Sequence, residues 1–132
     1  MDVVFLDANV LFSAAYQVES HFLKLRNMTG VSLVSSVYAA EEARRNLDGV
    51  EQRDRLEKLL RSVKLVAANE SKPLPKGINR PAKDKPILAA AIAVNATHLL
   101  TGDWKHFGPY RNTVVEGVLV LSTASYFRSR SL

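Results

Sequence analysis

The chain has 132 residues, 47% hydrophobic and 23% charged, a composition typical of a globular domain and unlike that of a disordered chain. It contains no cysteine, which excludes disulfides and thiolate metal sites, and no run of about 20 apolar residues, which a membrane span needs. The net charge of +5 is compatible with a polyanionic partner. We expect one domain over residues 1–132, located in the cytoplasm and without a signal peptide.

The first half of the chain alternates between short apolar runs and amphipathic segments. Residues 3–6 are apolar and rich in β-branched side chains, which indicates a buried strand. Ser35 or Ser36 is a candidate N-cap for the helix after the second strand. In chain order we expect a strand at 3–6, helices at 9–16 and 20–28, a strand at 31–34, helices from 35 or 36 to 47 and from 50 to 62, and a strand at 64–67.

The second half opens with a proline-rich segment. Residues 72–86 hold four of the five prolines of the chain, so we expect a loop there. A helix at 87–96, strands at 98–101 and 117–121, and a short C-terminal helix follow. Strands that alternate with helices predict an α/β fold with a mostly parallel sheet, covered by helices on both faces.

Acidic side chains fall at positions where such sheets bind ligands. Asp7 directly follows the first strand and Asp103 follows the fourth, and open parallel sheets bind ligands beyond the carboxyl ends of their strands. Each acid also has an ordinary interpretation. Asp7 and Asp84 could cap helices, and Asp103 could be a turn residue. Glu41 is spaced for a weak surface pair with Arg45.

Several acids that converge on one edge of a sheet repel one another. Two carboxylates about 4 Å apart repel by several kcal/mol even at an effective dielectric of about 20. Such a cluster must hold protons, face salt bridges or bind a cation, and an all-oxygen site favours a hard ion, Mg²⁺ or Mn²⁺. A pair of divalent ions suits attack of water on a phosphodiester, because one ion activates the water and the other stabilises the leaving oxygen.

Three segments together resemble the PIN domain of metal-dependent ribonucleases: FLDANVLFSA at 5–14, EEARRNL at 41–47 and KDKPILAAAIAVNATHLLTGDWKHF at 83–107. The resemblance spans nearly the whole chain. It implies a three-layer α/β/α sandwich around a five-stranded, mostly parallel sheet, with three or four acids that coordinate Mg²⁺ or Mn²⁺, and RNA as the substrate. A stand-alone domain of this length also resembles the VapC-type toxin of a type II toxin–antitoxin pair, which implies an antitoxin partner and a homodimer.

The resemblance assigns roles by position. Asn9 matches a small polar position that orients the site, and Ser13, one turn later, could support it by a hydrogen bond or be a small helix residue. A further acid that sometimes follows the last aspartate of the family is absent, since Trp104, Lys105 and His106 occupy its places. The acids that match the catalytic and metal-binding positions are Asp7, Glu42, Asp84 and Asp103.

The second acid of this set is open on physical grounds. The apolar face of its helix leaves Glu41 and Glu42 about equally far from the core, on opposite flanks. Glu42 is preferred because the family pattern places a leucine five residues further on, here Leu47.

Basic and aromatic side chains near these acids are candidates for contacts with RNA. Basic residues in the stiff segment 72–86 could hold phosphates without reading sequence, or could serve only solubility. Trp104 could stack on a base or pack beneath the end of a strand. His21, His98 and His106 show no metal-ligand spacing, and none is an obvious general base. The basic candidates are Lys72, Lys76, Arg80, Lys83 and Lys85 in the segment, and Arg44 and Arg45 after Glu42.

Two other functions stay open. A phosphatase or phosphotransfer domain with Asp7 as nucleophile would need a second aspartate where Asn9 stands. A catalytically silent PIN fold could bind RNA or protein, but the filled acid positions argue against it. Metal-dependent cleavage that Asp7→Asn abolishes would separate a nuclease from the silent module, and an aspartyl-phosphate would support phosphotransfer.

Overall fold

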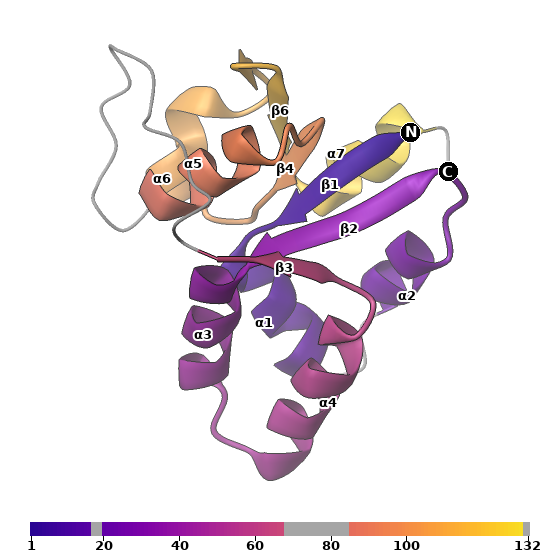
Figure 1. Cartoon of the computed structure of the whole chain (residues 1–132), viewed down its shortest axis with the longest axis vertical. Coiled ribbons are helices and arrows are strands. Elements are labelled where there is room, and N and C mark those ends of the chain that lie inside the picture. The colour runs from indigo at the N-terminus through magenta and orange to yellow at the C-terminus, as the bar shows by residue number, and fades with distance from the viewer. Residues whose placement is uncertain (17–19, 68–84, 131–132) are drawn as a thin grey trace.

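The structure, a computed structural model, describes residues 1–16, 20–67 and 85–130, and in these ranges six strands form one sheet. Their order is β3-β2-β1-β4-β6-β5, so β1 lies in the middle (Figure 1). All neighbouring strands are parallel except the last pair. The strands are β1 (Asp2–Leu6), β2 (Val31–Ser36), β3 (Lys64–Val66), β4 (His98–Leu100), β5 (Val114–Val115) and β6 (Val118–Leu121).

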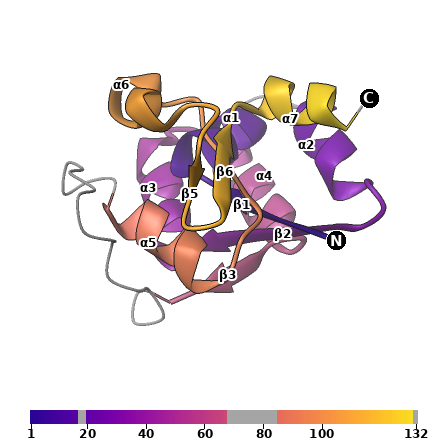
Figure 2. The same cartoon turned by 90° about the horizontal axis from the view of Figure 1, so that it is seen from above.

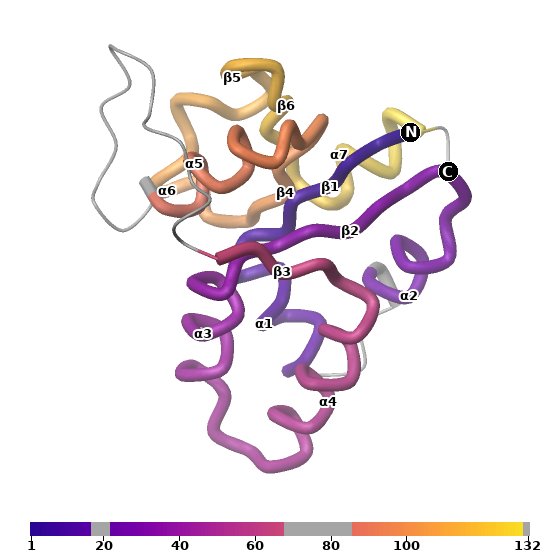
Figure 3. Tube along the Cα trace, viewed as in Figure 1, coloured from indigo at the N-terminus to yellow at the C-terminus, as the bar shows by residue number. Residues whose placement is uncertain are grey.

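The register of β1 brings the carboxyl ends of two distant strands together. Val4 pairs with Leu33 of β2 on one side and with His98 of β4 on the other. The last residue of β1, Leu6, pairs with Leu100, so both strands end at the same edge of the sheet (Figure 3). The three residues from Val4 to Leu6 have no exposed surface, as expected for a parallel strand that is buried on both faces.

Helices cover both faces of the sheet. In Figure 1, α1, α2 and α4 lie below the strands and α5 lies above them, so the expected three-layer α/β/α arrangement is confirmed. N-cap side chains begin α3, α6 and α7: Ser36 accepts a hydrogen bond from the backbone N–H of Ala39, Asp103 from that of His106, and Ser122 from that of Ser125. The helices are α1 (Ala8–Tyr16), α2 (Ser20–Arg26), α3 (Val37–Asn46), α4 (Val50–Leu60), α5 (Lys85–Ala93), α6 (Trp104–Phe107), a 3₁₀ turn at Gly108–Tyr110, and α7 (Thr123–Ser129).

The expected count of five strands is wrong, because the described part of the sheet has a sixth. β5 contains two residues and pairs antiparallel with β6, beside which it lies in Figure 2. The turn between them is Glu116–Gly117, in which both residues have positive φ, 49° and 85°. Positive φ at both central residues is the conformation of a type I′ turn, one of the two common two-residue hairpin turns. Gly117, expected as the first residue of a strand, belongs to this turn.

Other differences lie at the ends of elements. Of the two candidate caps, Ser36 caps α3, whereas the buried hydroxyl of Ser35 donates to the carbonyl of Leu6 at 2.7 Å. The helix expected at 87–96 spans Lys85–Ala93, and the chain turns at Asn95, whose φ is 55°. Most of the loop expected at 72–86 lies outside the described residues. None of the helices within the described ranges is both long and apolar enough to cross a bilayer.

Candidate active site

Asp7 is a buried carboxylate at the point where β1 ends and α1 begins. Its side chain is among the few buried polar groups, with a relative exposure of 6%. One carboxylate oxygen, Oδ1, accepts a hydrogen bond from the backbone N–H of Ala8 at 2.6 Å. The other, Oδ2, accepts from the hydroxyl of Thr101 at 2.7 Å. Both bonds fix the orientation of the carboxylate, but neither partner brings a positive charge.

Thr101 joins two of the acids. Its hydroxyl donates to Asp7 and accepts a hydrogen bond from the backbone N–H of Asp103 at 3.0 Å. The side chain is buried at the carboxyl end of β4, next to the end of β1. Thr101 was not among the residues predicted from the sequence, although a hydroxyl side chain directly after a strand, in the Thr-Gly-Asp segment, was an available signal.

Asp103 is held from both sides. It is the N-cap of α6 and accepts from the backbone N–H of His106 at 3.2 Å. Its Oδ2 lies 2.8 Å from Nδ1 of the His106 ring. The ordinary interpretation of Asp103 was a turn residue, but the structure makes it the N-cap of a short helix and also places it in the cavity with Asp7. His106, for which the sequence predicted no role, orients this carboxylate.

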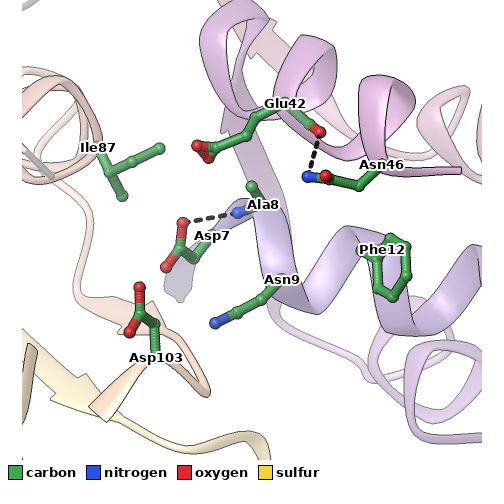
Figure 4. A pocket seen from close by; sticks show the side chains of 8 residues that line it. All are labelled: Asp7, Ala8, Asn9, Phe12, Glu42, Asn46, Ile87 and Asp103. Carbon is green, nitrogen blue, oxygen red and sulfur yellow. Dashed lines mark hydrogen bonds between the residues drawn. The ribbon is translucent and has the colours of Figure 1, made fainter. Parts of the chain in front are cut away.

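The structure separates the two glutamates of α3. Glu42 is half-buried and lines a cavity with Asp7 and Asp103, as Figure 4 shows. Glu41 is exposed and forms an ion pair with Arg44. The expected partner of Glu41 was Arg45, so this pair forms at a spacing of three residues instead of four. The geometry favours Glu42 as the second acid of the site.

The cavity has a volume of about 350 Å³ and receives side chains from three helices and from the segments after β1 and β4. Figure 4 shows Asp7 and Glu42 with their carboxylates directed toward each other, and Asp103 approaching Asp7 from the opposite side. Asn46 and Phe12 lie at the far end of the cavity from Asp103. The lining residues are Asp7, Ala8, Asn9, Phe12, Glu42, Asn46, Ile87 and Asp103.

Burial and neighbouring charge make Asp7 a weaker acid than usual. Burial, reinforced by the charges of Glu42 and Asp103, raises the pKa of Asp7 from 3.8 to about 6. The hydrogen bonds from Thr101 and Ala8 oppose this shift. Within the described residues, no lysine or arginine forms an ion pair with Asp7 or Glu42. In the described part of the chain, the carboxylates of Asp7 and Glu42 therefore face each other without a basic side chain between them.

The donor set fits a hard divalent cation. Carboxylate oxygens are the preferred ligands of Mg²⁺ and Mn²⁺, and the strain on Asp7 is the kind that a bound cation relieves. In the ranges that the structure describes, no three acidic or histidine side chains are close enough as placed to form a complete metal site. Asp84, the remaining expected ligand, lies outside these ranges.

Asn9 and Ser13 differ in their relation to the acids. Asn9 lines the acidic cavity, and its Oδ1 accepts a hydrogen bond from the backbone N–H of Gly102 at 3.1 Å, which ties α1 to the segment that carries Asp103. Ser13 is exposed and lines a second cavity of about 340 Å³, on the other side of Asn9. The structure thus brings Asn9 to the acids and does not bring Ser13 there.

The expected RNA-binding side chains are placed unevenly. Arg44 donates to Glu57 of α4 at 2.8 Å in addition to its pair with Glu41, so its charge is already balanced. Arg45 is exposed. The guanidinium of Arg111 lies 4.5 Å from the centre of the Trp104 ring, so one face of that ring is covered. Lys72, Lys76, Arg80, Lys83 and the side chain of Lys85 lie outside the described part of the chain.

Comparison with solved structures shows that other proteins share this fold. No protein-family model matches the sequence, and no curated protein matches it. A chain of VapBC2 from Rickettsia felis, bound to a DNA fragment from their promoter, superposes with a TM-score of 0.62 at 15% identity, over 89% of this chain and 96% of that one. A chain of VapBC-1 from nontypeable Haemophilus influenzae gives a TM-score of 0.59 at 17% identity, over 92% and 98%. At these identities the likeness shows a common fold.

Proposed function

We propose that this chain, whose fold is the PIN fold shared with VapBC structures, is a metal-dependent endoribonuclease that acts as the toxin of a type II toxin–antitoxin pair. The observation that supports this most strongly is the buried carboxylate of Asp7, which lines one cavity with Glu42 and Asp103 and has a raised pKa. Among the described residues, no lysine or arginine forms an ion pair with Asp7 or Glu42. A cluster of this kind at the carboxyl ends of parallel strands is typical of a functional site.

Asp7, Glu42 and Asp103, together with Asp84, would hold Mg²⁺ or Mn²⁺. When bound, such a cation would lower the pKa of a water molecule and offset the charge of the phosphodiester. The residues of the chain supply the geometry. Thr101 and the N–H of Ala8 fix the two oxygens of Asp7, so its carboxylate cannot rotate away from the cavity.

Supporting contacts hold the rest of the site. Asn9 fixes the backbone at Gly102, and His106 fixes the side chain of Asp103. Outer contacts of this kind set the orientation of ligand carboxylates and tune their affinity for metal. RNA is the proposed substrate because a carboxylate-held cation suits phosphodiester hydrolysis and because the chain has a net charge of +5.

The proposed partner is an antitoxin protein, since two solved structures that share this fold are of VapBC proteins. A homodimer is proposed on the resemblance of the sequence alone. Binding of an antitoxin would be expected to silence the nuclease, so a co-expressed partner should be removed before any assay.

The direct test is cleavage of labelled single-stranded RNA and DNA with Mn²⁺, Mg²⁺ or EDTA. The wild type is compared with Asp7→Asn and with Glu41→Gln, an acid-to-amide change on the exposed side of α3. We expect metal-dependent cleavage of RNA by the wild type and by Glu41→Gln, and none by Asp7→Asn. Equal cleavage by all three proteins would identify a contaminant. Metal-dependent binding of RNA by the purified chain without cleavage would instead support a silent binding module.

A further inference from the structure

One face of α1 continues from the acids toward an aromatic pair. Asn9, Phe12 and Tyr16 are spaced three and four residues apart and therefore lie along one stripe of the helix. Phe12 lines the acidic cavity and is half-buried. The ring of Tyr16 lies 5.4 Å from that of Phe12, tilted by 30°, and this side chain is 53% exposed. An aromatic surface therefore begins inside the cavity and extends to solvent.

An amide group from α3 faces the same cavity. Asn46 follows Glu42 by one helical turn, lines the cavity and is exposed. Its Nδ2 donates to the backbone carbonyl of Glu42 at 2.9 Å, which holds the side chain in place (Figure 4). Its Oδ1 accepts no hydrogen bond from any residue in the described ranges. The amide is thus fixed and still has an acceptor to offer to a ligand.

We propose that the Phe12 and Asn46 end of this cavity binds one unpaired nucleobase of the RNA, beside the phosphodiester at the acids. This inference rests on the proposed function, because it places the base of the same substrate. A ring face for stacking and a side-chain amide for the base edge are the two groups that recognise splayed-out bases in single-stranded RNA. The acids at one end of the cavity would lie beside the phosphate of a nucleotide, and Phe12 and Asn46 at the other end would contact its base.

The size of the cavity restricts the substrate. A volume of about 350 Å³ is in the range of pockets that hold one small ligand, so the cavity suits a single nucleotide. A base can enter only after it leaves its stack, so the substrate class is single-stranded RNA or an unpaired loop. Stacking is tolerant of base identity, because every base has a ring face, whereas the amide of Asn46 can discriminate among base edges.

The first experiment measures binding in the absence of cleavage. Asp7→Asn is the parent, and the probes are a short labelled single-stranded RNA and copies in which one nucleotide at a time is abasic. Phe12→Leu is added to this parent because leucine keeps the apolar packing and removes the ring face. Phe22→Leu, a change in the second cavity, is the matched control, and thermal unfolding reports whether each variant is folded.

We expect Phe12→Leu to weaken binding of the intact RNA by about 5- to 150-fold, the range for loss of one base–aromatic stack. For the parent protein, the RNA that is abasic at one particular position should bind more weakly than the intact RNA, to a similar extent. For the Phe12→Leu protein, that abasic RNA and the intact RNA should bind equally. Unchanged binding with Phe12→Leu would overturn the proposal, as would a loss confined to Phe22→Leu. If Phe12→Leu has unfolded, the abasic series in the parent decides, since equal binding of all probes also overturns it.

The second experiment concerns base preference and separates this inference from the proposed function. In cleavage of a randomised single-stranded RNA pool, Asn46→Ala should change the preferred base at one position, whereas Phe12→Leu should lower the rate for all four bases. Cleavage with unaltered preference and rate in both variants would overturn the base site and leave the nuclease standing. Base-dependent binding without any cleavage by the wild type would overturn the nuclease and leave the base site standing.

Discussion

Replacing Asp7 with asparagine should stabilise the metal-free protein while it removes the proposed nuclease activity. The pKa of Asp7 is raised from 3.8 to about 6, and one pKa unit corresponds to about 1.36 kcal/mol. Keeping this carboxylate charged in the folded state therefore costs about 3 kcal/mol near neutral pH. Asparagine has nearly the same shape and no charge, so this cost disappears.

Part of the gain is lost again at Thr101. The amide nitrogen of asparagine would face the hydroxyl of Thr101, which already accepts from the N–H of Asp103. The hydroxyl proton then has no carboxylate acceptor, and a lost hydrogen bond of this kind costs about 0.5–1.5 kcal/mol. We expect a net increase of about 2 kcal/mol in the free energy of unfolding.

The pH dependence has a definite sign. Between the unfolded pKa of about 4 and the folded pKa of about 6, the folded protein binds more protons at Asp7 than the unfolded chain does. The stability of the wild type therefore falls as pH rises through this window and stays low above it. In Asp7→Asn this decrease is absent, so the two proteins differ most above about pH 6 and differ least below about pH 4.

Urea unfolding in EDTA across this pH range measures the difference, and Mn²⁺ provides the complementary condition. A bound cation should stabilise the wild type and not Asp7→Asn, which narrows the difference or reverses it. If Asp7→Asn is less stable than the wild type at neutral pH in EDTA, then hydrogen bonding outweighs burial at Asp7, and this carboxylate is not a strained group that a cation relieves.

Three further predictions concern the neighbours of Asp7 and a site at the other end of β1. Thr101→Val should lower RNA cleavage about 10- to 100-fold and destabilise the fold by about 1–3 kcal/mol, measured by rates and urea unfolding, because it removes a shared partner of two acids. Glu42→Gln should remove most of the RNA cleavage, whereas Glu41→Gln should retain it and change the free energy of unfolding by less than about 1 kcal/mol. Loss of cleavage in Glu41→Gln alone would instead make Glu41 the second acid of the site. Asp2→Asn should destabilise the protein by about 1–2 kcal/mol at neutral pH, because the Asp2 carboxylate accepts hydrogen bonds from Tyr126 and Arg130. Burial raises the pKa of Asp2, but these two partners outweigh burial, so the pKa is lowered. Since the pKa of Asp2 is lowered, the difference in stability between the wild type and Asp2→Asn should disappear as pH falls below about 4. A stability difference that persists in acid would refute this prediction.

The layer order could be predicted from the sequence because its signals are local. Short β-branched runs mark buried strands, and the acids that follow them mark the carboxyl edge of a parallel sheet. β5 was missed because two valines carry no periodic signal, and the Glu116–Gly117 turn needs positive φ at a glutamate, a residue that rarely adopts it. α6 was missed for a similar reason, since its four residues depend on the cap that Asp103 provides.

The site was only partly predictable, because tertiary contacts decide the rest. Adjacent residues on a helix point in different directions, so the choice between Glu41 and Glu42 depends on where α3 packs. Phe12 and Asn46 have the sequence character of ordinary helix residues and become cavity residues only where α1 meets α3. Arg44, expected near the substrate, is instead bound to Glu57 from another helix, a contact that sequence spacing does not indicate.

The pairing of β1 with β4 also sets the point in synthesis at which the acidic cavity can be completed. The hydrogen bond that orients Asp7 joins residues 94 positions apart, and β4, which brings Thr101 to it, is translated long after β1. A growing chain that ends before Thr101 has Asp7 but neither the hydroxyl that orients it nor Asp103. If the proposed function holds, a nascent chain would therefore have no complete active site until most of the polypeptide has been made, and a proposed antitoxin could be made in that interval.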